Sequence, residues 1–150
     1  MTDHRARNDA SRARLEVIAG GVAGGTHRVD VGEWSPSTLL AHLAFWDRLT
    51  LQRWHAAIRD GRSTPADLPD GLQDLINDAS APAWSALSPT SASSEAVAAA
   101  GELDAFLATV DDALAAQLEA EGRPRLVDRS RHRTEHLDAI EAATRGERAV

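Results

Sequence analysis

The chain contains no cysteine, no lysine and no tyrosine among its 150 residues. The lack of cysteine excludes disulfides, thiolate metal ligands and a cysteine nucleophile. Because all 16 basic residues are arginine, a Schiff-base lysine and the lysine of a P-loop are excluded as well. Six histidines are present, and their imidazoles ordinarily titrate near neutral pH.

Long apolar runs and a positive net charge are also missing. The longest dense apolar stretch, about residues 39–46, is interrupted by His42 and is far too short to cross a bilayer. The first 21 residues have no signal-peptide apolar core, so we expect a cytoplasmic protein without a membrane partner. The net charge of −7 argues against nucleic acid as the main partner.

Length and periodicity predict one all-α domain over residues 1–150. Four segments, residues 3–22, 35–61, 93–121 and 124–145, carry apolar residues at helical spacing, and no segment alternates as a strand does. The second has the clearest start, with Ser35 as a cap and Pro36 in the first turn. Residues 61–92 form a long, proline-rich connection, with short helices near 72–77 and near Trp84, that we expect to pack as a lid. A connection of this length lets the second and third helices run parallel.

His132 and His136 are the most informative pair in the sequence. Residues four apart on a helix lie about 40° apart around the axis, so both imidazoles leave the same face. A third histidine, His42, lies on the apolar stripe of the second helix, between Leu39 and Trp46. Three inward imidazoles on two helices predict a site for a transition metal inside a helical protein.

Two other interpretations of this pair remain open. One is a solvated, arginine-rich helix that happens to carry two histidines. The other is the inverted zincin pattern H-x-x-E-H, spelled by residues 132–136, in which Glu135 would be a general base. Only 14 residues follow His136, which leaves little room for a distant third ligand. Glu135 is more simply explained by an ion pair with Arg131 on the outer surface, but it stays the nearest candidate base.

Several other polar residues are expected to be structural or incidental. His4 is expected in a fraying terminus, His27 in a loop and His55 off the His42 face, while Asp104 and Asp111 are expected on a solvated face. The basic run of residues 123–133 is expected to be solvated too, except for Arg129, which could reach an anionic ligand of the site. Trp46 and Trp84 fit either plain core or the walls of a substrate pocket.

Two segments, WSPSTLLAHLAFWDR (34–48) and DRSRHRTEHLDAIE (128–141), together with INDA (76–79), resemble the DinB/YfiT-like superfamily of metalloenzymes. Within it the chain is most similar to the N-terminal, metal-binding domain of mycothiol-dependent maleylpyruvate isomerases. The resemblance implies a four-helix bundle with a long second connection and a metal held by His42, His132 and His136. His132 stands where that isomerase has glutamate, which is the all-histidine pattern of other DinB-like proteins.

The resemblance also implies what such a site does. It points to a thiol-dependent S-transferase or isomerase that acts on small electrophilic metabolites, and to a homodimer. Three imidazoles leave a metal with open positions and suit Zn or Ni best. A composition typical of GC-rich bacterial genes makes mycothiol the expected thiol. The alternatives are a non-catalytic metal- or ligand-binding protein and a metal-dependent hydrolase.

Overall fold

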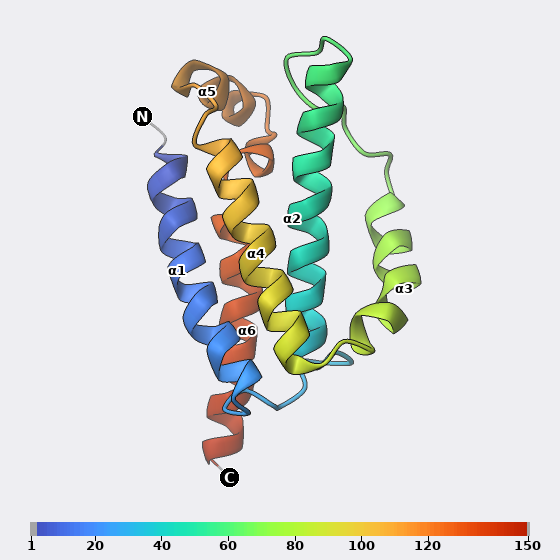
Figure 1. Cartoon of the computed structure of the whole chain (residues 1–150), viewed down its shortest axis with the longest axis vertical. Helices are drawn as coiled ribbons and strands as arrows, with labels where there is room; N and C mark the ends of the chain where they lie inside the picture. Colours follow the sequence, from blue (N-terminus) through green and yellow to red (C-terminus); the bar gives the residue numbers. More distant parts are fainter. Residues whose placement is uncertain (1–2, 150) are drawn as a thin grey trace.

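The computed structural model describes residues 3–149, and the regular elements of this part of the chain are helices joined by loops (Figure 1). It contains six α-helices, one 3-10 helix and, apart from an isolated bridge between Val31 and Trp34, no β structure. The α-helices are α1 (His4–Ala23), α2 (Pro36–Arg59), α3 (Leu72–Ser85), α4 (Pro89–Leu107), α5 (Asp112–Ala120) and α6 (Ser130–Ala149), and the 3-10 helix is η1 (Pro124–Leu126). The expected all-α fold is confirmed.

α2 and α4 both begin with a serine N-cap followed by a proline. Ser35 Oγ accepts a hydrogen bond from the backbone N–H of Thr38 at 3.1 Å, and Pro36 occupies the first turn of α2. Ser88 and Pro89 repeat this arrangement at the start of α4. The predicted start near residue 93 is therefore wrong by about one turn, because the Ser-Pro signal comes earlier.

The predicted third helix is broken in two. α4 ends at Leu107, and α5 begins after Asp111, whose carboxylate accepts a hydrogen bond from the backbone N–H of Leu114 at 2.7 Å. A capping aspartate competes with helix continuation because it satisfies the free N–H groups of a new first turn. The single helix expected over residues 93–121 is thus corrected to two.

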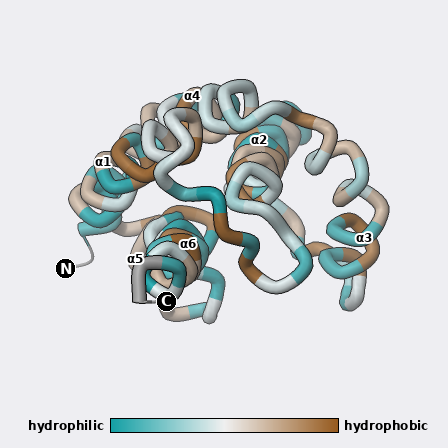
Figure 2. The backbone as a smooth tube through the Cα atoms, turned by 90° about the horizontal axis from the view of Figure 1, so that it is seen from below, coloured by the Kyte–Doolittle hydropathy of each residue, from teal (hydrophilic) through white to brown (hydrophobic). Residues whose placement is uncertain are grey.

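Four long helices make up most of the packing. α1 packs against α4 and α6, and α2 packs against α4 and, over a shorter contact, against α6. α2 and α4 run in the same direction, as predicted, and α1 and α6 run opposite to them (Figure 1). α3 packs against α2 on the side of the molecule away from α1, as seen from below in Figure 2.

The core has two hydrophobic clusters with charged residues between them. The larger cluster is built from α1, α2, α4, α6 and Trp84, and the small side chains of α4 let its neighbours approach closely. The smaller cluster gathers around Trp54 of α2 and Leu118 of α5. In α2 the buried Asp47 lies between Ala44 of the first cluster and Trp54 of the second. Among the helices that the structure describes, none is both long and apolar enough to cross a membrane.

Candidate metal centre

His42 lies in the buried middle of α2, with 3% of its surface exposed. It shares its helix face with Leu39 and Trp46, both buried, so the stripe predicted from the sequence does point inward. The indole rings of Trp34 and Trp84 stand 5.2 and 5.3 Å from its imidazole, centroid to centroid. These rings give His42 an apolar surrounding.

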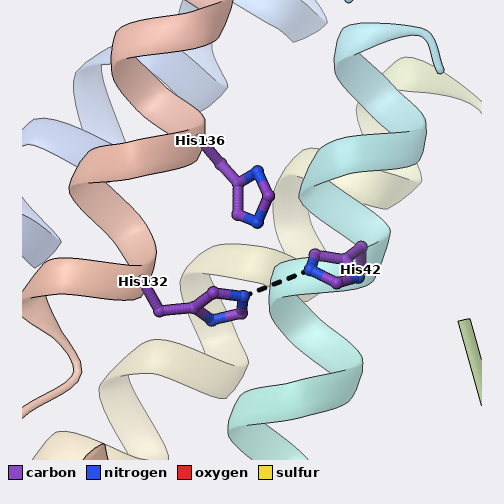
Figure 3. Close-up of side chains that lie close together, drawn as sticks. All are labelled: His42, His132 and His136. Carbon is purple, nitrogen blue, oxygen red and sulfur yellow. Dashed lines mark hydrogen bonds between the residues drawn. The ribbon is translucent and has the colours of Figure 1, made fainter. Parts of the chain in front are cut away.

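His132 and His136 project from α6 toward His42, as predicted (Figure 3). One ring nitrogen from each of the three histidines lies within 4.8 Å of the others. The Nε2 atoms of His42 and His132 are 3.2 Å apart. The structure therefore brings together the three residues that the sequence nominated.

This arrangement fits a metal ion. Two nitrogens bound at about 2.0–2.1 Å to one tetrahedral metal are about 3.3 Å apart, close to the separation of the two Nε2 atoms. Among residues 3–149 no other group of three or more histidine or acidic side chains gathers in this way. Three imidazoles could bind a metal ion and would leave at least one coordination position open.

Burial keeps all three imidazoles neutral. It is the main cause that lowers the pKa of His42 to about 4 and that of His132 to about 2, and it lowers the pKa of His136 as well. Repulsion between protonated His136 and protonated His42 adds to the effect on His42, and the positive charge of Arg129 adds to the effect on His132. A neutral imidazole is the form that binds metal, so metal binding releases no net proton from these rings at neutral pH.

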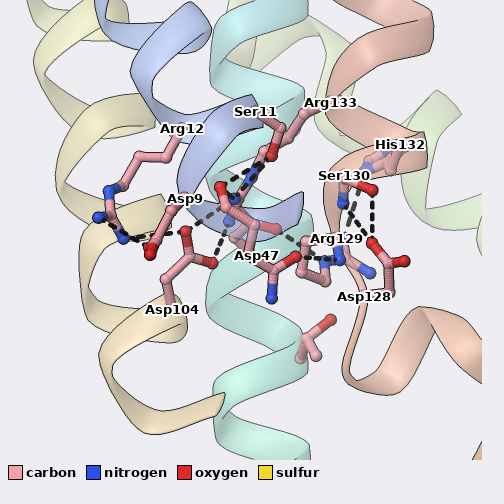
Figure 4. A network of polar contacts seen from close by, with 12 residues as sticks. Asp9, Ser11, Arg12, Asp47, Asp104, Asp128, Arg129, Ser130, His132 and Arg133 are labelled. Carbon is pink, nitrogen blue, oxygen red and sulfur yellow. Dashed lines mark hydrogen bonds and ion pairs between the residues drawn. The ribbon is translucent and has the colours of Figure 1, made fainter. Parts of the chain in front are cut away.

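Arg129 links His132 to a buried ionic network (Figure 4). Its Nη2 donates a hydrogen bond to Nδ1 of His132 at 3.3 Å, and its Nε donates to Asp47 at 2.9 Å. A guanidinium only donates, so this bond needs an unprotonated Nδ1 and places the ring proton on Nε2. Binding of a metal through Nε2 requires the opposite tautomer, and Arg129 must then release Nδ1.

A cavity of about 650 Å³ opens beside the histidines, with His132 and Trp46 in its wall. It lies among α2, the residues that precede α3, and the connection from α5 to α6. The indole N–H of Trp46 donates to the side-chain oxygen of Asn77 in α3 at 2.8 Å, which fixes the ring at this wall. Trp46 is thus both buried core and cavity wall, whereas Trp84 packs in the main cluster.

The other residues considered in the sequence, Arg129, Glu135 and His55, lie outside the histidine cluster. Arg129 lines the cavity, but its guanidinium is already paired with Asp47. Glu135 is exposed and lies in a separate surface depression, and within residues 3–149 no ion pair joins it to Arg131. His55 is exposed, as expected.

Three expectations about polar residues are wrong. His4 is buried in α1, with its Nε2 3.1 Å from the carbonyl oxygen of Leu107, and does not lie in a fraying end. Asp104 is buried and not solvated, because it pairs with Arg133. Arg133 is 0% exposed, so it does not belong to a solvated basic run.

The sequence did contain a signal for this network. Asp47 lies on one helical stripe with Leu43 and Trp54, all buried. Arg133 lies on a stripe with Leu137 and Ile140, again buried. A charged residue at the inward position of an apolar stripe indicates a buried partner of opposite charge.

Comparisons of the chain with protein-family models, with curated proteins and with solved structures give no match.

Proposed function

We propose that this protein is a metal-dependent enzyme that uses a small thiol to convert an electrophilic metabolite, by S-transfer or by isomerisation. The observation that carries the proposal is the set of three imidazole nitrogens within 4.8 Å beside a cavity of about 650 Å³. A closed structural site would need a fourth protein ligand, and a cavity at the wall of His132 gives a small molecule access instead.

The arrangement of the helices supports a place among DinB-like proteins. α1, α2, α4 and α6 are the long helices that pack on one another, and the long connection between α2 and α4 lets these two run parallel. We propose that they form a four-helix bundle of the DinB type. The proposal extends to a homodimer, as the resemblance implies, and to a location in the cytoplasm, as expected from the sequence.

The ligand set favours zinc or nickel as the cofactor. Imidazole suits both metals, and neither the chain's composition nor its described side chains offer a thiolate ligand. Such an ion would supply strong acidification of a bound thiol or water. The three histidines would hold it, and the Trp46 ring would form the apolar wall for the substrate.

The composition of the chain and the position of the nominated base agree with a thiol co-substrate. The chain has no cysteine, so a sulfur nucleophile has to come from outside, and mycothiol is the expected source. Hydrolysis needs a general base near the bound water. Glu135, the nominated base, is exposed and does not line the cavity, and two of the three carboxylates in the cavity wall, Asp67 and Asp128, are paired with arginines, which favours thiol chemistry over hydrolysis.

Metal analysis of purified protein tests the first part of the proposal. We expect about one equivalent of zinc or nickel in the wild type and its loss in His132→Ala and in His136→Ala. His55→Ala is the control, since it removes an exposed histidine from α2. A wild type that contains no metal and takes up neither added ion would refute the proposal.

Turnover tests the second part. The metal-loaded protein should consume an electrophile such as 1-chloro-2,4-dinitrobenzene in the presence of mycothiol, and His42→Ala should abolish this. Full metal occupancy with no reaction, across a panel of thiols and electrophiles, would instead identify a binding protein.

A further inference from the structure

The cavity beside His132 is strongly basic, although the protein is acidic. Its wall carries six arginines and three carboxylates, whereas the whole chain has a net charge of −7. The arginines are Arg7, Arg53, Arg123, Arg125, Arg129 and Arg131. Positive charge gathered in one hollow of an acidic protein raises the local concentration of small anions.

Half of these arginines are already neutralised by ion pairs. Arg7 pairs with Asp128 at 2.7 Å and Arg123 with Asp67 at 2.8 Å. Arg129 pairs with the buried Asp47 at 2.9 Å, as described above. These pairs fix the shape of the wall and leave the other three arginines, with Glu119, to determine its charge.

Arg53, Arg125 and Arg131 form no ion pair with the part of the chain that the structure describes. Arg53 is half-buried and donates only to the backbone oxygen of Ala66, at 2.7 Å. Its pKa is lowered, mainly by burial and then by the charges of Arg123 and Arg129. A guanidinium in such surroundings gains most from a bound anion, because the anion both pairs with it and offsets its neighbours.

The three unpaired arginines come from different elements around the same hollow. Arg53 lies on α2, Arg125 in η1 and Arg131 in the first turn of α6. His132, the ligand that lines the cavity, directly follows Arg131 in the chain. An anion held among the three would therefore have the rest of its molecule next to His132.

We propose that this cavity binds the anionic group, a carboxylate or a phosphate, of a small-molecule substrate, and that Arg53, Arg125 and Arg131 hold it. The inference rests on the proposed function for the identity of the molecule as a substrate. Binding of the anion itself depends only on the arginines. The substrate class is then an electrophile or a thiol that carries a negative charge away from its reacting atom.

Calorimetric titration tests the proposal with metal-free wild-type protein in a buffer of low ionic strength. Succinate and inorganic phosphate are the two probes, and dimethyl succinate is the uncharged control ligand. The test variant is Arg53→Gln/Arg125→Gln/Arg131→Gln. The matched control is Arg28→Gln/Arg59→Gln/Arg145→Gln, which removes the same charge from exposed side chains outside the cavity wall.

We expect at least one of the two anions to bind the wild type and the control variant, and the test variant to lose at least tenfold in affinity. Tighter binding of succinate would identify the anionic group as a carboxylate, and tighter binding of inorganic phosphate would identify it as a phosphate. Failure of both anions to bind the wild type, equal binding of dimethyl succinate, or equal loss in both variants would overturn the proposal.

His42→Ala separates this inference from the proposed function, because His42 belongs to the candidate metal centre but does not line the cavity. The variant should keep its affinity for the anion although it loses the metal. Absence of metal or of turnover in the wild type would refute the proposed function and leave the anion titration unaffected, whereas failed anion binding would leave the metal analysis unaffected.

Discussion

The guanidinium of Arg133 donates two hydrogen bonds to the carboxylate of Asp104, at 2.9 and 2.8 Å, and the two side chains expose only 0% and 3% of their surface. Burial alone lowers the pKa of Arg133, but the charges and hydrogen bonds of Asp47 and Asp104 outweigh it and raise the pKa. The pair joins α6 to α4, and Asp47 adds α2 to the same contact. This contact among Asp47, Asp104 and Arg133 holds in place α2 and α6, the helices that carry the three histidines.

Replacement of Arg133 by methionine should lower the free energy of unfolding by about 3–5 kcal/mol, because two buried carboxylates lose their shared cation. Urea unfolding monitored by circular dichroism measures the loss. Asp138→Asn is the control, since it breaks the exposed pair with Arg14 and should cost less than about 1 kcal/mol. A similarly small loss in Arg133→Met would show that water reaches the network.

The sequence allowed the histidine site to be predicted because its signals are local. The spacing of His132 and His136 determines a shared face, and the apolar neighbours of His42 determine that its face is buried. The start of α2 could be predicted for the same reason, because Ser35 and Pro36 act within one turn of the helix.

The ionic network could not be predicted in the same way. The apolar stripe of Arg133 indicates that this residue has a buried partner, but nothing in its own segment says that the partner is Asp104, which lies on a different helix. Their pairing depends on how α4 and α6 are rotated and offset against each other, which no local pattern encodes. The break after Leu107 was missed for a related reason, because the cap at Asp111 competes with a helical pattern that continues through it.

Stability of the metal-free protein should fall as the pH drops below about 6.5. The folded state holds His42 and His132 neutral, with pKa values lowered to about 4 and about 2, whereas in the unfolded chain both titrate near 6.5. The unfolded state therefore binds more protons in this window, and acid favours unfolding. Between its pKa in the folded state and its pKa in the unfolded chain, each histidine lowers the free energy of unfolding by about 1.4 kcal/mol for every pH unit of acidification.

Urea unfolding at pH 7 and at pH 5 measures this dependence. His42→Asn and His132→Asn should each flatten it, and His55→Asn, at an exposed position, should leave it unchanged. If the free energy of unfolding of the two site variants falls between pH 7 and pH 5 as much as that of the wild type, the acid sensitivity comes from other groups.

Metal binding should stabilise the folded protein. An ion that binds only the folded state adds about 2.7 kcal/mol at a free concentration of one hundred times its Kd. The thermal midpoint of the wild type should thus rise with added zinc or nickel and return on chelation. His42→Ala should show no such rise, and His55→Ala should behave as the wild type. A rise that persists in His42→Ala would place the metal elsewhere.

Replacement of Arg129 by glutamine should strengthen metal binding about tenfold. Arg129 opposes the metal in two ways: its positive charge repels a cation, and its hydrogen bond to Nδ1 of His132 favours the tautomer with the proton on Nε2. Glutamine removes the charge, and its amide oxygen can accept a hydrogen bond from the Nδ1–H group, the bond that metal-bound histidines usually make. Competition with a fluorescent zinc chelator measures the affinity. A weaker affinity in Arg129→Gln, in protein of unchanged helical content, would show instead that Arg129 holds His132 in its binding orientation.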